Sequence, residues 1–226
     1  MTTPQPDVPP IAFFDGHYYK LLPVPGKWPT VCIDGIQMHR TVRMDPETDA
    51  LKKVEALRPR IHDIVLDVCT GLGYTAITLA ERGCRVVTLE KDPNIMRIAR
   101  ANPFSQPLFD RSTESFPPEP GRIKLIMGDA AETVRTFGPG LFDAVMHDPP
   151  RFTIAESLYS AAMYAELFRV LKAGRWMLHY VGNPHRRHPK YKNIIPNMMR
   201  RLRDAGFDVM EPVEDIECLR VRKPAR

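Results

Sequence analysis

Several patterns that would assign a protein to a particular class are missing from this sequence of 226 residues. No apolar run approaches the roughly 18 to 20 residues that a membrane-spanning helix needs. The first ten residues have neither a positively charged region nor an apolar stretch, so we expect a loose arm there and no signal peptide. From these absences we expect a cytoplasmic protein.

Cysteine is also scarce. The four cysteines, Cys32, Cys69, Cys84 and Cys218, are scattered along the chain without the paired spacing of metal ligands. Cys69 and Cys84 lie in stretches that we expect to form core strands. We therefore expect reduced, buried thiols and no metal site.

The most informative stretch that is present covers residues 64–83, where an apolar run meets a glycine turn. The run over residues 64–69 suits a strand of a parallel sheet that is covered on both faces. Gly71 and Gly73 let the backbone turn tightly and approach a bound molecule closely, although simple close packing would also explain them. Helical spacing resumes after the turn. The stretch therefore predicts a strand, a ligand-binding turn and a helix.

Carboxylates near this turn indicate the kind of ligand. Glu90 ends the second apolar run, residues 85–90, where nucleotide-like ligands present their ribose hydroxyls. The third glycine of a dinucleotide-binding turn is missing, because position 76 is alanine, and Asp67 stands just before the turn. An aspartate there would repel a pyrophosphate but suits an amino or sulfonium cation. The sequence therefore favours S-adenosylmethionine over NAD as the cofactor.

Two further apolar runs end in aspartate, at Asp129 and at Asp148. A single aspartate at a strand end is more often a helix cap or a turn residue. Four carboxylates at successive strand ends are harder to explain in that way, because the strand ends of a doubly wound sheet open onto one crevice. We expect Asp129, with Ala130, near the adenine of the cofactor, and Asp148 at the reaction centre.

With these residues the chain resembles the class I S-adenosylmethionine-dependent methyltransferases, from about residue 64 to the C-terminus. The resemblance implies a Rossmann-like α/β fold with a seven-stranded sheet and helices on both faces. The family often has glycine where this sequence has Cys69. If the backbone departs from the path that it takes in the family, we expect the difference at that position. The residues that the resemblance assigns to the cofactor are Asp67, Thr70, Gly71, Gly73, Tyr74, Glu90, Lys91, Asp129 and Ala130.

Three stretches, residues 38–40, 67–76 and 147–152, are also similar to a group of predicted methyltransferases found mostly in archaea. The last one is an Asp-Pro-Pro turn, which in related enzymes holds an amino nitrogen through the carboxylate and a proline-fixed carbonyl. We therefore expect Asp148 and the carbonyl of Pro149 to orient the nucleophile. The residues expected to contact the acceptor are His39, Arg40, Arg151, Phe152 and Tyr180.

Residues 1–60 are expected to form an elaboration that covers the crevice, and residues 61–226 the cofactor-binding domain. Two Asp-Gly pairs, at residues 15–16 and 34–35, predict two hairpins. Asp45 is expected to cap a helix that starts at Pro46 and carries Leu51, Val54 and Leu57 at helical spacing. Residues such as His39 and Arg40 would line the substrate pocket, although plain packing against the core explains them equally well.

The second half of the chain predicts a helix over residues 155–171 that ends at Ala173-Gly174, a fifth strand over 176–181 and a helix over 194–205. The last two apolar runs have no helix between them, so they should pair antiparallel.

Positive charge is concentrated between Leu167 and Arg203, a stretch with ten lysines or arginines and no acidic residue. A solvated basic face and a nucleic-acid footprint explain this pattern equally well. RNA is therefore a possible partner through the segment from Arg186 to Arg203.

Three functional hypotheses follow from the sequence. The leading one is a methyltransferase that acts on a nitrogen of an RNA base or of a small amine-bearing substrate. The second is an aminopropyltransferase that uses decarboxylated S-adenosylmethionine, for which an acid-lined tunnel is expected. The third is a non-catalytic RNA-binding protein that keeps the fold.

Overall fold

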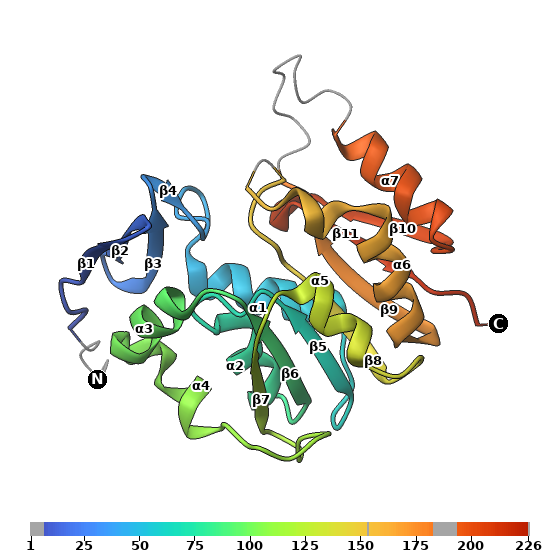
Figure 1. The fold of residues 1–226 in the computed structure, drawn as a ribbon, viewed down its shortest axis with the longest axis horizontal. Coiled ribbons are helices and arrows are strands. Elements are labelled where there is room, and N and C mark those ends of the chain that lie inside the picture. Colours follow the sequence, from blue (N-terminus) through green and yellow to red (C-terminus); the bar gives the residue numbers. More distant parts are fainter. Residues whose placement is uncertain (1–6, 153, 183–193, 226) are drawn as a thin grey trace.

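Two β-sheets organise the chain, a four-stranded sheet near the N-terminus and a seven-stranded sheet after it (Figure 1). The structure, a computed structural model, describes residues 7–152, 154–182 and 194–225. The small sheet is antiparallel with the order β1-β2-β3-β4. Its strands are β1 (Ala12–Asp15), β2 (His17–Val24), β3 (Lys27–Ile33) and β4 (Ile36–Gln37).

Both predicted hairpins are confirmed. Gly16 and Gly35 each follow an aspartate between paired strands and have positive φ angles, 72° and 81°, as tight hairpin turns require. Pairing of β2 with β3 joins the two hairpins into one sheet.

The large sheet has the order β10-β11-β9-β8-β5-β6-β7. Neighbouring strands from β7 to β9 run parallel, whereas β11 is antiparallel to β9 and to β10. The carboxyl ends of β5, β6, β7 and β8 therefore meet at one edge, as the sequence predicts. The strands are β5 (Ile64–Val68), β6 (Arg85–Glu90), β7 (Ile123–Met127), β8 (Phe142–His147), β9 (Leu171–Tyr180), β10 (Val209–Val213) and β11 (Cys218–Arg222).

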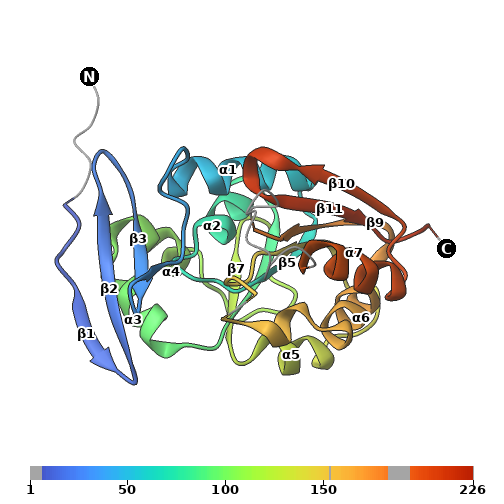
Figure 2. The ribbon, with the colours of Figure 1, turned by 90° about the horizontal axis from the view of Figure 1, so that it is seen from above.

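Helices cover both faces of this sheet. Figure 2 shows α1 and α2 on one side and α5, α6 and α7 on the other. Each face has its own apolar core, and the core on the α1 side also takes in residues of the small sheet. The helices are α1 (Pro46–Leu57), α2 (Tyr74–Glu81), α3 (Pro93–Ala101), α4 (Gln106–Asp110), α5 (Ala130–Thr133), α6 (Ala161–Val170) and α7 (Ile194–Asp204). None of these described helices has the length and apolarity to cross a membrane.

Helix α1 begins as predicted, because the side chain of Asp45 accepts a hydrogen bond from the amide of Thr48 at 3.0 Å and Pro46 follows. The predicted apolar stripe is wrong in one position. Leu51 is 40% exposed, while Val54 and Leu57 are buried. The buried stripe instead includes Asp49 and Lys53.

The prediction for residues 155–171 is also wrong in its bounds. A 3₁₀ turn occupies Glu156–Tyr159, and α6 starts only after Ser160, whose hydroxyl accepts a hydrogen bond from the amide of Met163. Helix α6 ends at Val170 and passes directly into β9, because Leu171 already has extended backbone. Ala173-Gly174 therefore lies within a strand rather than at the end of a helix.

The remaining predictions of secondary structure are confirmed in outline, although the strand predicted over residues 176–181 runs from Leu171 to Tyr180. Helix α7 starts at Ile194, and β10 pairs antiparallel with β11. The long connection after α3 contains the short helix α4.

The turn after β5 depends on left-handed backbone. Cys69, Gly71 and Gly73 have φ angles of 73°, 56° and 81°. Cys69 thus adopts a left-handed backbone that favours glycine, at the cost of the strain that a side chain brings to this conformation. A Cβ atom on Gly73 would lie 2.9 Å from Cδ2 of Leu108, whereas one on Gly71 would meet nothing within 4 Å.

We predict that Gly73→Ala lowers the free energy of unfolding by about 2 to 3 kcal/mol, because it combines backbone strain with a clash. Gly71→Ala should cost only about 1 to 2 kcal/mol, since only the strain applies. Gly138→Ala is the control, because a Cβ there meets no atom within 4 Å and its φ angle is not positive. Urea titration measures all three, and equal losses for Gly71→Ala and Gly73→Ala would contradict the packing account.

Candidate functional site

The candidate site lies at the carboxyl edge of the large sheet, where four predicted carboxylates follow one another along adjacent strands. Asp67 is near the end of β5, Glu90 ends β6, Asp129 follows β7 and Asp148 follows β8. The strand order places β5 between β6 and β8. The four residues thus come from one edge, but their environments differ.

Asp67 is fully buried and bonds to two threonines. Its Oδ1 accepts a hydrogen bond from Oγ1 of Thr75 at 3.0 Å, and its Oδ2 accepts one from Oγ1 of Thr88 at 2.7 Å. Burial raises the pKa of Asp67 to about 7, although both hydroxyls oppose that shift. Asp67 therefore titrates near neutral pH inside the protein.

Glu90 is 9% exposed and is held by backbone amides. Its Oε2 accepts a hydrogen bond from the amide of Gly71, and its Oε1 accepts from the amides of Lys91 and Asp92, all at 3.0 Å. Burial raises the pKa of Glu90, and the three amides oppose this. A carboxylate has about four lone-pair positions, so one on Oε2 remains for a ligand hydroxyl, and a second hydroxyl would share a position with an amide.

The glycine turn provides open space beside Glu90, since Gly71 has no atom near its missing side chain. Thr70 bonds through Oγ1 to Oγ1 of Thr88 at 2.7 Å, which ties the turn to β6. Tyr74 points elsewhere, because its hydroxyl donates to the carbonyl of Pro29 in β3 at 2.8 Å. The turn fits a ligand that approaches backbone closely.

Asp129 and Lys91 lie on the exposed side of this edge. Asp129 caps α5 by accepting a hydrogen bond from the amide of Ala131 at 2.8 Å, and Ala130 is buried next to it. The ammonium of Lys91 lies 3.9 Å from Oδ2 of Asp129. Capping of α5 is thus the structural role of Asp129. Its contact with the adenine of a cofactor stays a prediction.

Asp148 pairs with a residue that the sequence reasoning missed. Its Oδ2 lies 2.7 Å from Nζ of Lys53, and the same ammonium lies 2.7 Å from Oδ2 of Asp49. Burial lowers the pKa of Lys53, but the carboxylates of Asp148 and Asp49 outweigh burial and leave that pKa above its usual range. Burial raises the pKa of Asp148, and Lys53 opposes this.

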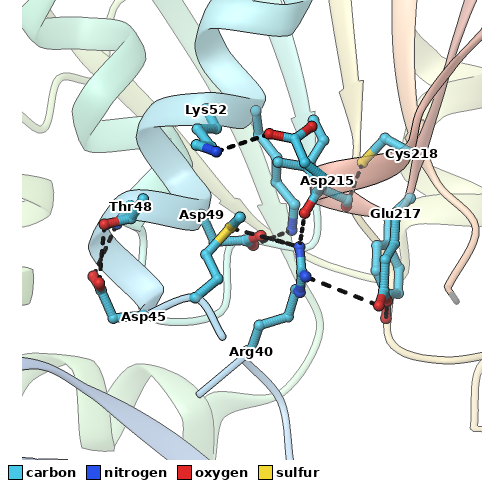
Figure 3. Close-up of polar contacts among 12 residues, drawn as sticks. Arg40, Asp45, Thr48, Asp49, Lys52, Asp215, Glu217 and Cys218 are labelled. Atoms are coloured by element: carbon cyan, nitrogen blue, oxygen red, sulfur yellow. Dashed lines mark hydrogen bonds and ion pairs between the residues drawn. The ribbon is translucent and has the colours of Figure 1, made fainter. Parts of the chain in front are cut away.

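Arg40 belongs to the same network (Figure 3). Its guanidinium donates to the carbonyl oxygen of Asp215 at 2.6 Å and to Oδ1 of Asp49 at 3.3 Å, and it lies 4.0 Å from Oε1 of Glu217. His39 bonds through Nδ1 to Oγ1 of Thr30 at 3.0 Å. Burial lowers the pKa of His39 to about 4, with a smaller contribution from Lys53.

The turn that follows Asp148 is anchored from behind. Tyr159 donates its hydroxyl to the carbonyl of Pro150 at 2.8 Å, and the ring of Phe152 lies 5.5 Å from the Tyr159 ring. Pro149 is buried, whereas Arg151 is exposed.

Two buried histidines lie beneath this turn, with ring centroids 4.5 Å apart. Nε2 of His147 bonds the carbonyl of Leu158, and Nε2 of His179 bonds the hydroxyl of Tyr164, each at 2.9 Å. Burial lowers the pKa of His147 to about 4, so the neutral ring supports the turn by packing.

Tyr180 is the last residue of β9, directly after His179. Its ring centroid lies 5.1 Å from the ammonium of Lys53, and its hydroxyl donates to Oε2 of Glu217 at 3.4 Å. Burial raises the pKa of Tyr180 to about 12, with Glu217 adding to the shift, so this phenol is a hydrogen-bond donor at neutral pH.

Of the basic segment from Arg186 to Arg203, residues 186–193 lie outside the described residues. On α7, Arg200 pairs with Asp204 at 3.3 Å, and Arg201 donates to the carbonyl of Tyr159 at 2.9 Å. Within the described ranges no cluster of three or more His, Cys, Asp or Glu residues suits a metal ion, and the four cysteines are free thiols.

Comparisons with known proteins give relatives of two kinds. No protein-family model matches the chain. An uncharacterized protein of Methanocaldococcus jannaschii is 44% identical over 205 residues, which are 90% of this chain and 66% of that protein. Ribosomal RNA small subunit methyltransferase J of Pseudomonas syringae is 24% identical over 136 residues, 60% of this chain and 46% of that protein. The chain thus spans about half to two thirds of these relatives.

Solved structures match over most of the chain. Spermidine synthase from Thermotoga maritima gives a TM-score of 0.66 at 16% identity over 93% of this chain and 70% of its own. Phosphoethanolamine N-methyltransferase 2 of Haemonchus contortus, in complex with S-adenosylhomocysteine, gives 0.52 at 19% identity over 72% of this chain and 37% of its own. The chain has the class I methyltransferase fold. At these identities the likeness extends to the fold alone.

We predict that Asp67→Asn changes the pH dependence of stability. The folded pKa of about 7 lies above the unfolded value near 3.9, so Asp67 has no effect below about pH 4, destabilises the fold increasingly between about pH 4 and pH 7, and has a constant effect above that. The unfolding free energy of Asp67→Asn relative to wild type should therefore increase by about 2 to 3 kcal/mol between pH 5 and pH 8.

Chemical denaturation at both pH values measures this difference. Asp110→Asn, at an exposed position, is the control and should show no such change. A constant difference between Asp67→Asn and wild type would mean that Asp67 does not titrate near neutral pH.

Proposed function

We propose that the protein is an S-adenosylmethionine-dependent methyltransferase that acts on a nitrogen atom. The observation that carries the proposal is the pairing of Glu90 with the glycine turn, in which the amide of Gly71 fixes a buried carboxylate beside open backbone. A nucleoside ribose offers two hydroxyls to such a carboxylate. The fold and the names of the bacterial relatives support the same reaction class.

The residues at the carboxyl edge fit this cofactor. Glu90 would accept the ribose hydroxyls, the turn at Thr70 to Gly73 would border the methionine part, and Asp129 with Ala130 would border the adenine. Asp67 would act from behind the turn, because both of its oxygens are bonded to threonines. When bound, S-adenosylmethionine supplies an electrophilic methyl group.

Asp148 would orient the acceptor. Its carboxylate and the carbonyl of Pro149 would accept N–H hydrogen bonds and hold the nitrogen lone pair in line with the methyl group. The bond from Tyr159 to the Pro150 carbonyl stiffens this turn. Phe152 would stack on a planar acceptor, and Arg151, Tyr180, His39 and Arg40 would shape the pocket around it.

The acceptor class that we propose is a base of RNA or a small molecule with an amino group. Support for RNA comes from the basic stretch that continues into α7 and from the ribosomal RNA methyltransferases among the relatives. Transfer of tritiated methyl groups into separated RNA, protein and metabolite pools of the source cell tests the reaction and identifies the pool. No transfer into any pool, together with cofactor binding, would indicate a non-catalytic RNA-binding protein.

Glu90→Ala should weaken S-adenosylmethionine binding by about 1.5 to 3 kcal/mol, through the loss of charge-assisted hydrogen bonds to the ribose. Isothermal titration measures the affinity, with Glu81→Ala at the exposed end of α2 as the control. Unchanged affinity in a folded Glu90→Ala variant would rule out its role. Equal affinity for NAD would overturn the cofactor assignment, and tighter binding of decarboxylated S-adenosylmethionine would indicate an aminopropyltransferase.

Asp148→Ala should abolish methyl transfer and keep cofactor affinity within about tenfold, because Asp148 acts on the acceptor. Asp148→Asn keeps one acceptor oxygen, so a nucleophile that needs only orientation should retain partial activity. Single-turnover transfer measures both variants. Transfer by Asp148→Ala at the wild-type rate would place the reaction centre elsewhere.

A further inference from the structure

Lys53 is a buried cation in direct contact with Asp148 at the proposed reaction centre, and it has no role in the reaction proposed above. It lies on α1, in the N-terminal part of the chain, and its side chain is 7% exposed. Its ammonium reaches Asp148, 95 residues away in sequence, at 2.7 Å. The ring centroid of Tyr180 lies 5.1 Å from the same ammonium.

The charges around Lys53 form a chain of alternating sign. Glu217 lies near Arg40, Arg40 near Asp49, Asp49 near Lys53, and Lys53 near Asp148. Figure 3 shows Arg40 between Asp49 and Glu217. Because Arg40 also neutralises Asp49, the positive charge of Lys53 can compensate the negative charge of Asp148. Asp148 stands at the end of this series of charges, and Lys53 is the cation that pairs with it.

The contact is specific to one oxygen of Asp148. Lys53 binds Oδ2, and among the described residues no hydrogen bond reaches Oδ1. The Asp148 side chain is 22% exposed, so it remains accessible to solvent. An ion-paired carboxylate is a good hydrogen-bond acceptor and a weak base, because its negative charge is stabilised.

We propose that Lys53 is a positioning residue that keeps Asp148 charged and fixed through Oδ2, so that Oδ1 accepts the N–H of the methyl acceptor. This inference rests on the proposed function. It makes α1 part of the reaction site, and it assigns to Asp148 the orientation of the nucleophile rather than removal of its proton. The other titratable groups that face the pair are Asp49, Asp67, His39, Cys69, Tyr159, Tyr180 and Cys218, and Arg40 pairs with Asp49.

A titration of Asp148 in Lys53 variants tests the proposal without a known acceptor. The side-chain carboxyl carbon of Asp148 is followed by NMR, and its signal is assigned by its loss in Asp148→Asn. In Lys53→Met the midpoint should rise by about one pH unit or more, because burial is then unopposed. Lys53→Arg should restore a midpoint near that of wild type.

Lys52→Met is the matched control, because Lys52 is the neighbouring residue on α1, is 42% exposed at its side chain and pairs with Asp215 at 2.8 Å. It should leave the Asp148 midpoint unchanged. An Asp148 midpoint that is the same in wild type, Lys53→Met and Lys52→Met would overturn the proposal.

Methyl transfer into the pool that wild type labels gives the second readout. Lys53→Met should lower kcat about 100-fold and move the acid limb of the pH–rate profile to higher pH, with affinity for S-adenosylmethionine within about threefold. If Lys53 had a purely structural role, Lys53→Met would lower kcat and the affinity for S-adenosylmethionine together and would leave the acid limb of the pH–rate profile in place. That result would contradict the proposal.

Asp49→Asn keeps the proposal testable if Lys53→Met does not fold. This variant leaves Lys53 with Asp148 alone, so the Asp148 midpoint should fall, and a rise would overturn the proposal. Failure of wild type to bind S-adenosylmethionine would refute the proposed function. Cofactor binding with an Asp148 midpoint that ignores Lys53 and Asp49 would refute only this inference.

Discussion

Two buried carboxylates and a half-buried one, at one edge of the large sheet, are the constraint on which the site depends. A buried carboxylate without partners costs several kcal/mol, so each one must be compensated where it lies. Asp67 is compensated by two threonine hydroxyls, Glu90 by three backbone amides and Asp148 by the ammonium of Lys53. The three carboxylates therefore differ in their chemistry. Asp67 titrates near neutral pH, Glu90 is a fixed hydrogen-bond acceptor, and Asp148 is an ion-paired acceptor.

The N-terminal part of the chain supplies the third solution. Helix α1 carries Lys53, and the loop before it carries Arg40. The small sheet is joined to the same region, because the hydroxyl of Tyr19 donates to Asp92 at 2.7 Å, just after Glu90. Tyr19 also shares a buried core with residues of the large sheet. The N-terminal elaboration is therefore part of the structure that sets the charges of the site.

Local sequence signals predicted the framework well. The apolar runs, the glycine turn and the Asp-Gly pairs each act through residues that are close in sequence, and the structure has the strands and hairpins that they indicate. The helix over residues 155–171 failed for the same reason, because its apolar spacing continued across Ser160 and Leu171, where a cap and an extended residue set the real bounds. Periodicity identifies a helix but does not fix its ends.

The partners of the site residues could not be read from the sequence. Lys53 meets Asp148 only because α1 packs against the ends of β8 and β9. One signal was present, since Asp49 and Lys53 share the helical stripe of Ala50, Val54 and Leu57, where charged residues are out of place unless they are paired. The shifted pKa values of Asp67 and His39 likewise depend on burial, which the sequence does not give.

The most direct test of this account is a crystal structure of the protein with S-adenosylhomocysteine. The account predicts the ribose hydroxyls on Glu90, the sulfur facing the Asp148 side chain, and Lys53 still in contact with Oδ2 of Asp148. A shallow cavity of about 540 Å³ lies between α3 and β7 and is lined by Met96, Arg97 and Met127 among others. It does not include Glu90 or Asp148. A nucleoside bound there, or one whose ribose lies away from Glu90, would contradict the account.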